Sequence, residues 1–383
     1  MKKILTIVGA RPQFIKAAAI HRVIKQDYQN KMIEILVHTG QHYDKEMSAV
    51  FFDELAIEPP AYHLGIGSGE HGAQVGAMMI ELEKILKKEK PSIVLVYGDT
   101  NSTLAGALVA AKMHIPVAHV EAGLRSFDKT MPEEINRLLV DHVSTLLFCP
   151  TLTSIENLKK EELENGSISI PHINHPLVFH SGDVMYDSVL YYADRALQKR
   201  DWIKKLGLEE NNFVLATIHR AQNTDDKERL VSIVQSLLRL ATEYNYPVVL
   251  PIHPRTRKMM ENYVQPDFYA KIVNNTNLKI IAPVSYLEMI VLERMSRMII
   301  TDSGGVQKEA FFLQKPCIIL RAETEWVELL HEGSVLADAD EQKIVALFNT
   351  FLKSSTTSYQ NAMSIFGNGK SSFFICDKLY NYC

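Results

Sequence analysis

The chain alternates short apolar runs with longer amphipathic segments, and the alternation occurs twice. The runs of the first series are Lys3–Val8, Ile33–Val37, Ile93–Tyr97, Val117–Val120 and Leu146–Cys149. The runs of the second series are Phe213–Thr217, Val248–Pro251, Lys279–Ile281, Met298–Thr301 and Cys317–Leu320. Continuous Val, Ile and Leu runs separated by helices are typical of parallel strands buried on both faces. The pattern therefore predicts an α/β protein with two Rossmann-like domains, each built on a parallel sheet.

Length supports the same division, because 383 residues exceed the size that one hydrophobic core usually reaches. From about Ser167 to Gly182 the chain is rich in Pro, His and Asn and shows neither helical nor strand periodicity, which predicts a linker. We therefore expect an N-terminal domain over residues 1–175 and a C-terminal domain over residues 176–359. The run Ser354 to Ser358 marks a second break, after which residues 360–383 are expected to pack back on the first domain.

Composition excludes several classes of protein. A formal net charge of -4 lacks the basic excess of nucleic-acid binders, so anionic ligands must be met by local Arg and Lys side chains. No apolar stretch approaches the ~20 residues of a membrane span, and Arg11-Pro12 interrupts the N-terminal apolar run where a signal peptide needs its cleavage site. The four cysteines are scattered without a Cys-x-x-Cys pair, which fits reduced thiols. We expect a cytoplasmic enzyme that binds neither nucleic acid nor membranes.

The segment Met298–Glu309 joins an apolar strand directly to a helix through Ser303-Gly304-Gly305. Glycines at such a junction let backbone N–H groups converge, and the helix start adds a partial positive charge, so a phosphate can bind there. Glu309, about a turn and a half further on, is placed to accept hydrogen bonds from sugar hydroxyls. The segment predicts a nucleotide site, although a turn whose glycines only relieve backbone strain fits the same residues equally well.

Polar residues follow most of the expected strands, at the sheet edge where doubly wound folds bind their ligands. The cations among them suit a diphosphate. They are Arg11, Lys16, His219, Arg220, His253 and Arg255. The carboxylates permit general acid and base catalysis. They are Asp99, Glu121, Glu133 and Glu134.

Most of these carboxylates also have a purely structural explanation. Glu133 and Glu134 follow a proline and could be first-turn residues that suit the helix dipole, an explanation that we prefer for Glu134. Asp99 could be the N-cap of a helix that starts near Asn101. Glu121 is harder to explain in this way, because it follows an apolar strand and a buried carboxylate needs partners.

No cofactor and no metal are expected. Gly9-Ala10-Arg11 occupies the position of a dinucleotide loop but lacks the Gly-x-Gly-x-x-Gly pattern, which argues against NAD. His119-Val-Glu121 matches half of a zinc deaminase signature, yet no Pro-Cys-x-x-Cys follows it. The metalloprotease motif His-Glu-x-x-His is also absent.

Together, these motifs resemble those of the non-hydrolysing UDP-N-acetylglucosamine 2-epimerase family. The matching stretches run in order through the chain: Gly9 to Lys16, Thr39 to His42, Gly98 to Thr100, His119 to Arg125, Pro132 to Arg137, His219-Arg220, Thr301 to Glu309 and Phe366 to Lys370. The resemblance implies an architecture similar to that of glycosyltransferase-B enzymes, with the active site in the cleft between the domains. It also implies a homodimer.

Matching positions imply roles for individual residues. Ser303, Gly304 and Gly305 would bind the diphosphate of a UDP-sugar, and Glu309 would hold its ribose. Contacts to phosphate or sugar would come from Arg11, Lys16, Arg137 and His219, to which the cation set adds His253. The expected catalytic residues are Asp99, Glu121, Glu133 and His219.

The resemblance also implies a reaction. The hydrogen on C2 of the sugar is not next to a carbonyl, so its removal as a proton is easier when UDP leaves C1 in the same step. This gives a 2-acetamidoglucal, to which UDP is then re-added with protonation on the opposite face, while cations stabilise the departing diphosphate. Such an enzyme would supply precursors of bacterial surface polysaccharides. A retaining glycosyltransferase of the same fold and a hydrolysing 2-epimerase are the alternatives.

The chain departs from the family pattern in two places, one that bears on the choice of substrate and one that bears on regulation of the enzyme. Hexosamine epimerases that resemble this chain read Thr-Glu-Arg-Pro-Glu where it has Thr324 to Glu328, with Trp326 in place of the arginine. This, with Gly182 to Asp187, is similar to the branch that acts on UDP-2,3-diacetamido-2,3-dideoxy-glucuronate. The Trp326 indole could pack on an acetamido methyl group or could fill the core. Asp44 and Ala73 stand where allosteric members carry Gln and Arg, which argues against activation by substrate.

Overall fold

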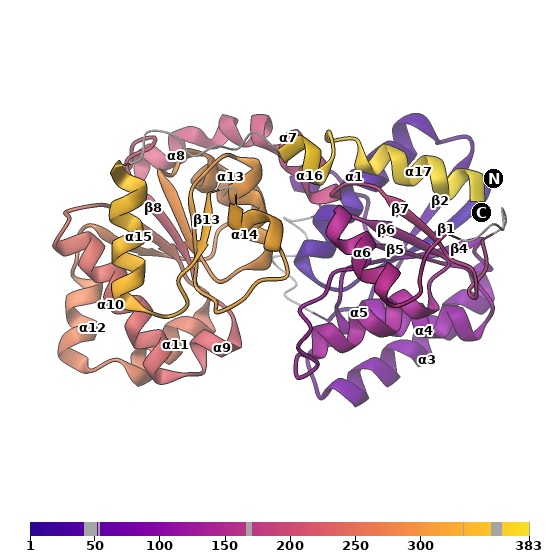
Figure 1. Cartoon of the computed structure of the whole chain (residues 1–383), viewed down its shortest axis with the longest axis horizontal. Coiled ribbons are helices and arrows are strands. Elements are labelled where there is room, and N and C mark those ends of the chain that lie inside the picture. Colours follow the sequence, from indigo (N-terminus) through magenta and orange to yellow (C-terminus); the bar gives the residue numbers. More distant parts are fainter. Residues whose placement is uncertain (42–51, 53, 166–170, 332, 354–361, 383) are drawn as a thin grey trace. The chain divides into compact units, whose positions relative to one another are not determined.

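The computed structural model of the chain describes residues 1–41, 52, 54–165, 171–331, 333–353 and 362–382 (Figure 1). It divides into two compact units: unit 1 comprises Met1–Ser188 and Met363–Cys383, and unit 2 comprises Val189–Ala362. Each unit contains one parallel sheet with helices on both faces, which confirms the α/β fold class that the sequence predicts. Asp44 and the predicted break from Ser354 to Ser358 lie outside the described residues.

Unit 1 contains a seven-stranded sheet in the order β3-β2-β1-β4-β5-β6-β7. Its strands are β1 (Lys2–Val8), β2 (Met32–His38), β3 (Tyr62–His63), β4 (Ile93–Tyr97), β5 (Val117–Val120), β6 (Leu146–Cys149) and β7 (Leu177–His180). The helices that follow its strands are α1 (Arg11–Asp27), α3 (His71–Glu89), α4 (Asn101–Lys112), α5 (Pro132–Val143) and α6 (Leu152–Lys160). Strand order reverses between β1 and β4, and doubly wound sheets bind ligands at such a point.

Unit 2 repeats this topology with six strands in the order β10-β9-β8-β11-β12-β13. They are β8 (Val214–Thr217), β9 (Val248–Pro251), β10 (Leu278–Ile281), β11 (Met298–Thr301), β12 (Cys317–Ile319) and β13 (Ser334–Leu336). The elements between and beside the strands are η1 (Leu197–Lys199), α8 (Arg200–Lys205), α9 (Ala221–Thr224), α10 (Lys227–Thr242), α11 (Pro254–Tyr263), α12 (Pro266–Val273), α13 (Tyr286–Met295), α14 (Gly304–Phe312), η2 (Val327–His331) and α15 (Glu341–Lys353). Here the order reverses between β8 and β11.

Each sheet is buried because its strands carry apolar side chains on both faces. In unit 1, α3, α4 and α5 cover one face, while α1 and the C-terminal α17 (Ser371–Tyr382) lie together on the other (Figure 1). In unit 2, α10 and α15 share a face and α13 and α14 lie on the opposite one. Strands β4 and β5 are fully buried, as are β8 and β11. This fixes the strand ends that carry the candidate site residues.

The segment predicted to be a linker is in part a strand, so that prediction is wrong for its last residues. Leu177–His180 forms β7, which pairs in parallel with β6, and the Phe179 ring stacks on that of Phe148 at 5.5 Å between centroids. This run directly follows a stretch rich in Pro, His and Asn and ends in a histidine, so its pairing with β6 and not its composition reveals it. Residues 166–170 of the same segment lie outside the described residues.

The C-terminal segment is attached to unit 1 through α7 (Val184–Ala196) and α16 (Ala362–Phe366). Asp187 of α7 accepts hydrogen bonds from the Ser371 and Ser372 backbone amides, at 3.1 and 2.7 Å, at the start of α17. A carboxylate at a helix N-terminus satisfies free N–H groups and interacts favourably with the helix dipole. Gly182, with φ of 74°, must be a glycine because a Cβ there would lie 2.6 Å from the Phe366 carbonyl oxygen.

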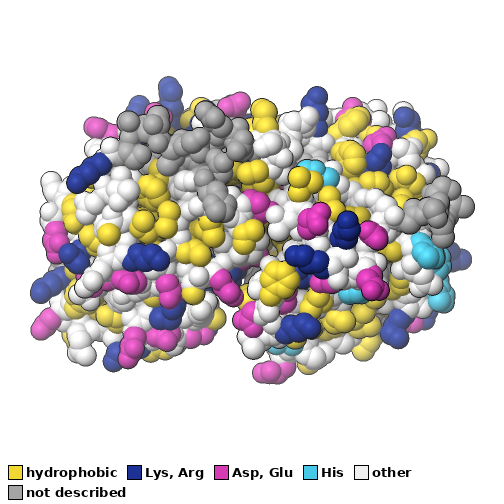
Figure 2. All heavy atoms as spheres, viewed as in Figure 1, with side chains coloured by type: hydrophobic (Ala, Val, Ile, Leu, Met, Phe, Trp, Pro, Cys, Tyr) yellow, Lys and Arg dark blue, Asp and Glu magenta, His cyan; other side chains and the backbone are white. Residues whose placement is uncertain are grey.

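The face of the molecule shown in Figure 2 carries Lys, Arg, Asp and Glu side chains interspersed on both units, without a continuous basic stripe. Among the described residues, no helix is both long and apolar enough to cross a membrane.

Candidate active site

The loops after β1 and β4 are tied together by one buried side chain. Gln13 Oε1 accepts hydrogen bonds from the Gly9 and Ala10 amides at 2.7 and 3.0 Å, and Gln13 Nε2 donates to the Tyr97 carbonyl at 2.7 Å. A Cβ on Gly9 would lie 2.0 Å from Ser102 Oγ, so only glycine fits there. The start of α1, with Arg11 and Lys16, is thereby held at the switch point of the sheet.

Lys16 and Glu121 form an ion pair at this sheet edge. Lys16 Nζ lies 2.6 Å from Glu121 Oε2, and the two side chains are 6% and 12% exposed. Glu121 directly follows β5 and has φ of 77°, a conformation that costs a non-glycine residue free energy and that recurs at functional sites. Gly98 lies beside the pair, since a Cβ on it would be 3.6 Å from Glu121 Oε1 and 3.7 Å from Lys16 Nζ.

Asp99, the residue after Gly98, pairs with an arginine of α5. Arg137 Nη2 lies 2.6 Å from Asp99 Oδ2, and the Asp99 side chain is 29% exposed. The helix that follows is capped by Thr100, whose side chain accepts from the Thr103 amide, so the alternative that Asp99 is the N-cap is wrong. Its carboxylate is therefore available for contacts beyond its own helix.

Glu134 and Glu133 are neighbours with different surroundings. Glu134 is buried and accepts hydrogen bonds from the Ser126 and Phe127 amides at 2.9 and 3.0 Å and from Arg137 at 2.8 Å. Burial alone would raise the pKa of Glu134, but these hydrogen bonds hold the pKa below its ordinary value. Glu133 is exposed in the first turn of α5. The structural role preferred for Glu134 fits these contacts.

Behind this edge lies a buried polar cluster that the sequence does not reveal. His119 of β5 contacts the Gly98 carbonyl through Nε2 at 2.8 Å and Asp141 of α5 through Nδ1 at 2.7 Å. Asp141 also accepts from the Gly123 amide and from Arg125. In the sequence Asp141 is one polar residue within an amphipathic helix, so only the fold shows what it contacts.

In unit 2, the loop after β11 leads into α14 as expected. Ser303 caps α14, its hydroxyl accepting from the Val306 amide at 3.3 Å. A Cβ on Gly304 would lie 2.8 Å from Glu325 Oε1, whereas one on Gly305 would meet nothing closer than 3.8 Å. Glu309 lies further along α14 and is 5% exposed. The glycine at 304 is thus required by packing, and that at 305 leaves the helix start open to a ligand.

Asp302 links this loop to the one after β8. It is buried and accepts from the His219 and Arg220 amides at 3.1 Å and from Asn223 Nδ2 at 3.1 Å. His219 Nδ1 lies 3.1 Å from Asp302 Oδ1, and the His219 side chain is 55% exposed. Burial alone would raise the pKa of Asp302, but His219 and the other donors hold that pKa below its ordinary value. Asp302 thereby orients the His219 imidazole ring, a role that the sequence alone does not show.

The remaining cations of unit 2 have partners of their own. His253 is the N-cap of α11, and its Nδ1 accepts from the Arg255 amide at 3.2 Å, which leaves the proton on Nε2. Arg255 pairs with Asp225 at 2.7 Å. Arg220 Nη2 lies 3.8 Å from Glu325 Oε1.

Trp326 is buried, which corrects one of the two expectations for it. It is 2% exposed, and Lys308 Nζ of α14 lies 3.9 Å from its ring centroid, a cation–π contact. Its backbone amide donates to Thr324 Oγ1 at 3.2 Å. The indole face is therefore occupied by Lys308, and the core-filling alternative describes this residue.

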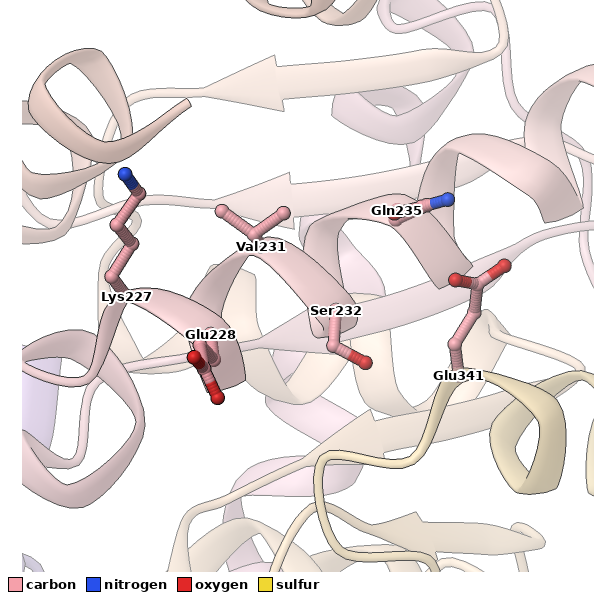
Figure 3. Close-up of a pocket in the computed structure, with 6 residues that line it drawn as sticks. All are labelled: Lys227, Glu228, Val231, Ser232, Gln235 and Glu341. Atoms are coloured by element: carbon pink, nitrogen blue, oxygen red, sulfur yellow. The ribbon is translucent and has the colours of Figure 1, made fainter. Parts of the chain in front are cut away.

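A surface depression elsewhere on unit 2 contains none of the predicted residues. It is lined by Lys227, Glu228, Val231, Ser232 and Gln235 of α10 and by Glu341 of α15 (Figure 3). Among the described residues, no group of three or more His, Cys, Asp or Glu side chains could hold a metal ion.

Nearly the whole chain is similar to known proteins. The family model described as UDP-N-acetylglucosamine 2-epimerase matches residues 25–380. A UDP-N-acetylglucosamine 2-epimerase homolog of Methanococcus maripaludis is 49% identical over 99% of both chains. The UDP-2,3-diacetamido-2,3-dideoxy-D-glucuronate 2-epimerase of Pseudomonas aeruginosa is 48% identical over 98% of this chain and 99% of its own. Among solved structures, the UDP-GlcNAc 2-epimerase of Methanocaldococcus jannaschii in complex with UDP-GlcNAc and UDP has a TM-score of 0.86 at 40% identity, covering 100% of both chains.

Proposed function

The chain belongs to the UDP-N-acetylglucosamine 2-epimerase family, and we propose that it is a non-hydrolysing enzyme that inverts C2 of a UDP-2-acetamido sugar. It would interconvert a UDP-N-acetylglucosamine-type sugar with its UDP-N-acetylmannosamine-type epimer. One observation carries the proposal. Asp99 and Glu121 follow the adjacent strands β4 and β5, and each carboxylate has a cation at 2.6 Å.

The proposed reaction begins with elimination. A carboxylate of unit 1 takes the proton from C2 while the C1–O bond to UDP breaks, and the electron pair of the C2–H bond forms the C1=C2 double bond of a 2-acetamidoglucal. UDP then adds back to C1 as a second carboxylic acid protonates C2 from the opposite face. Two carboxylates on adjacent strands, each held by its own cation, suit these two proton transfers, because one can take the proton as a base while the other, in its acid form, returns one.

We assign nucleotide binding to the strand ends of unit 2. Ser303, Gly304 and Gly305 would bind the diphosphate at the start of α14, and Glu309 would accept hydrogen bonds from the ribose. His219, aimed by Asp302, would donate to the diphosphate as it leaves. His253 would donate through Nε2, and Arg11 would bind phosphate or sugar from the start of α1.

The proposal leaves two candidate sugars, UDP-GlcNAc and the diacetamido glucuronate. Relatives named for either sugar are similar to this chain, at 48% and 40% identity. Trp326 no longer favours the diacetamido sugar, since Lys308 covers its ring. A proton NMR time course with each UDP-sugar distinguishes the two candidates. Inversion at C2 changes the H1–H2 coupling constant, so the change appears only in the spectrum of the sugar that the protein converts.

The same experiment tests the function, because the protein is incubated with the UDP-sugar alone. We expect the epimer to accumulate to equilibrium with no acceptor present, while the phosphorus spectrum shows only trace UDP. Free UDP in amounts equal to the sugar consumed would indicate a hydrolysing 2-epimerase. If turnover begins only when an acceptor is added, the protein is a retaining glycosyltransferase. If the protein binds the UDP-sugar but never converts it, the protein is a non-catalytic sensor of sugar nucleotides.

The proposal extends to assembly and cellular role. We expect a cytoplasmic homodimer that supplies precursors of bacterial surface polysaccharides. Ile135 and Leu139, one helical turn apart on α5, are 44% and 43% exposed, and such a pair is a starting point for mapping a subunit contact. Sedimentation of the wild type and of Leu139→Lys tests the dimer, which should be weaker in the variant.

A further inference from the structure

His119 is held between two hydrogen-bond acceptors. The residue is fully buried, with Nε2 at 2.8 Å from the Gly98 carbonyl oxygen and Nδ1 at 2.7 Å from Asp141 Oδ1. A carbonyl oxygen can only accept, and an ionised carboxylate can only accept. If Asp141 is ionised, both ring nitrogens must therefore carry a hydrogen.

The groups around Asp141 stabilise its ionised form. Its carboxylate accepts from the Gly123 amide at 3.1 Å and from Arg125 Nη1 at 2.7 Å, and Arg125 is permanently charged. Burial alone would raise the pKa of Asp141, but the charges and hydrogen bonds of His119 and Arg125 hold that pKa below its ordinary value. The carboxyl group thus has no proton to share with His119.

Charge balance in the core requires the same state. Arg125 also donates to Glu161, at 2.7 Å from both Nε and Nη2. With a charged ring on His119, the cluster holds two cations and two carboxylates. With a neutral ring, Arg125 alone would pair with the fully buried Asp141 while also pairing with the partly exposed Glu161, so the buried carboxylate would have one shared cation and not two.

The other groups that face the cluster do not alter this balance. Cys149 of β6 is a neutral thiol, since burial, with the Asp141 charge, raises its pKa. His142 Nε2 lies 3.4 Å from Glu161 on the solvent side, its side chain 48% exposed. The carbonyls of Gly98 and Leu124, which accept from His119 and from Arg125, are neutral polar neighbours.

The contact to Gly98 matters because of what surrounds it. Three consecutive carbonyls at the end of β4 each accept from a side chain: Tyr97 from Gln13 at 2.7 Å, Gly98 from His119, and Asp99 from Asn136 at 2.8 Å. Gly98 has φ of 62°. The Cα of Gly98 faces the Glu121–Lys16 ion pair. A shift of the turn formed by Gly98 and Asp99 would therefore displace Asp99 and also disturb that ion pair.

We propose that His119 is a doubly protonated imidazolium, its charge balanced by Asp141, that acts as a positioning residue by fixing the Gly98–Asp99 turn. This inference rests on the proposed epimerase function for its kinetic consequence, but its charge state is independent of that function. The hydrogen bond from His119 to the Gly98 carbonyl sets the geometry of the turn that carries Asp99 and lies beside Glu121.

The charge state is tested by NMR on the full-length protein labelled with nitrogen-15 in histidine, with His119→Gln identifying the signal. From about pH 5.5 to about pH 8.5, a range that spans the ordinary histidine pKa of about 6.5, both ring nitrogens should give the chemical shift of protonated nitrogen. A single unprotonated nitrogen at either end of this range would refute the imidazolium. The result does not depend on which reaction the enzyme catalyses.

The positioning role is tested by two variants of His119. Gln can still donate to the Gly98 carbonyl but carries no charge, whereas Leu does neither. We expect kcat to fall by about 10-fold in His119→Gln and by about 100-fold or more in His119→Leu, since small displacements of catalytic groups have effects of this size. The dissociation constant for UDP should stay within about 2-fold, because the proposed diphosphate groups belong to unit 2.

A matched control is His21→Leu. His21 is another buried imidazole of unit 1 paired with a carboxylate, with Nδ1 at 2.7 Å from Glu34 Oε2, so it resembles His119 in burial and in partner but belongs to α1. This variant should keep the wild-type kcat. Equal kcat in His119→Leu and wild type, or equal losses of kcat in His119→Leu and His21→Leu, would overturn the positioning role.

Asp141→Asn keeps the test decisive if His119→Leu does not fold. The introduced amide can donate to Nδ1, so the ring should become neutral while Nε2 still donates to the Gly98 carbonyl. We expect the NMR spectrum to lose one protonated ring nitrogen, and kcat to fall about as far as in His119→Gln. A ring that stays doubly protonated in this variant would contradict the charge argument. A wild-type enzyme that epimerises no UDP-sugar would instead refute the proposed function and leave the NMR result standing.

Discussion

At the scale of single residues, Glu121 and Asp99 are held in different ways. Glu121 has a strained backbone and a nearly buried side chain, and Lys16 fixes its carboxylate. Asp99 is more exposed and is held by Arg137, which in turn is anchored by Glu134. Each carboxylate therefore has an independent support, as expected if they act on opposite faces of one sugar ring.

Removing either carboxylate should stop catalysis without removing nucleotide binding. We expect Glu121→Gln and Asp99→Asn each to lower kcat by about 10²- to 10⁴-fold, the usual contribution of a general acid or base. Titration calorimetry with UDP should give wild-type affinity for both. The control is Glu58→Gln, which breaks an exposed Lys25–Glu58 pair and should leave kcat unchanged. Normal turnover in Glu121→Gln would contradict its proposed role.

Glu133 and Glu134 should separate catalysis from stability. Glu134→Gln removes one of the two carboxylates that pair with Arg137, leaving Asp99 as the other, and places an amide group where the carboxylate accepts from the Ser126 and Phe127 amides. We therefore expect a loss of about 1–3 kcal/mol in unfolding free energy. Glu133→Gln, at an exposed position, should leave stability unchanged and lower kcat if Glu133 is catalytic. Urea unfolding and initial rates measure the two effects. Unchanged kcat in Glu133→Gln would remove it from the catalytic set.

The sequence predicts residues whose chemistry follows from their own position, but not those defined by distant partners. Ser303, Gly304 and Gly305 are recognisable because an apolar strand, two glycines and a helix adjoin in the chain. Asp141 and Asp302 are not, since what they bind lies 18 and 83 residues away, at Gly123 and His219. The positive φ of Glu121 also has no sequence signal, because glycine or asparagine is the usual residue in that conformation.

At the scale of elements, the outer edge of the unit 1 sheet contains an unusual histidine. His38 ends β2 and pairs in register with His63 of β3, and the two rings meet edge to face at 4.5 Å between centroids. His38 is buried against Phe14, and within the described part of the chain neither ring nitrogen has a hydrogen-bond partner. Burial, with the His63 charge, lowers the pKa of His38 from 6.5 to about 4.

This histidine should make the protein sensitive to acid. The unfolded chain binds a proton at His38 below pH 6.5, whereas the native state does so only below about pH 4, so stability is full above pH 6.5 and is lost as the pH falls toward 4. We expect His38→Phe to reduce the loss in unfolding free energy between neutral and acid pH by on the order of 2 kcal/mol. Urea unfolding at the two pH values measures it. An equal loss in wild type and variant would assign the acid sensitivity to other groups.

Short strands are the elements that the sequence fails to show. β3 has two residues and β13 three, and β7 falls in a segment that composition assigns to a linker. Each exists because a neighbouring strand offers a free sheet edge, so its pairing partner and not its own pattern defines it. The long apolar runs, by contrast, reappear as strands within a residue or two of their expected ends.

At the scale of the whole molecule, one topology is used twice for different chemistry. Both sheets reverse their strand order beside the first strand, at β1 and at β8, and both place their polar residues after the strands that flank that point. Unit 1 carries the carboxylates with paired cations, and unit 2 carries the open helix start with Ser303 and Glu309. The fold could be predicted from repeated strand and helix patterns, whereas the burial of Trp326 could not, because it depends on Lys308 of another element.

The proposed roles, proton transfer by unit 1 and nucleotide binding by unit 2, predict where isotope labels appear after turnover in heavy water. In the proposed mechanism the C2 proton goes to one carboxylate and a different acid returns one from the opposite face, so the product should carry deuterium at C2. Proton NMR should show the H2 signal missing from the product as it forms. Oxygen-18 placed in the bridge between C1 and the β-phosphate should also scramble into the non-bridging positions, since the departed UDP can rotate before it re-adds.

The two isotopes together exclude the competing routes. Retention of the original hydrogen at C2 would indicate transfer within the sugar and would refute the elimination mechanism. Deuterium uptake without oxygen scrambling would mean either that the C1–O bond stays intact or that the protein holds the β-phosphate too firmly for its oxygens to exchange positions. Glu121→Gln should abolish uptake and scrambling together, because in a concerted elimination neither bond breaks without the other.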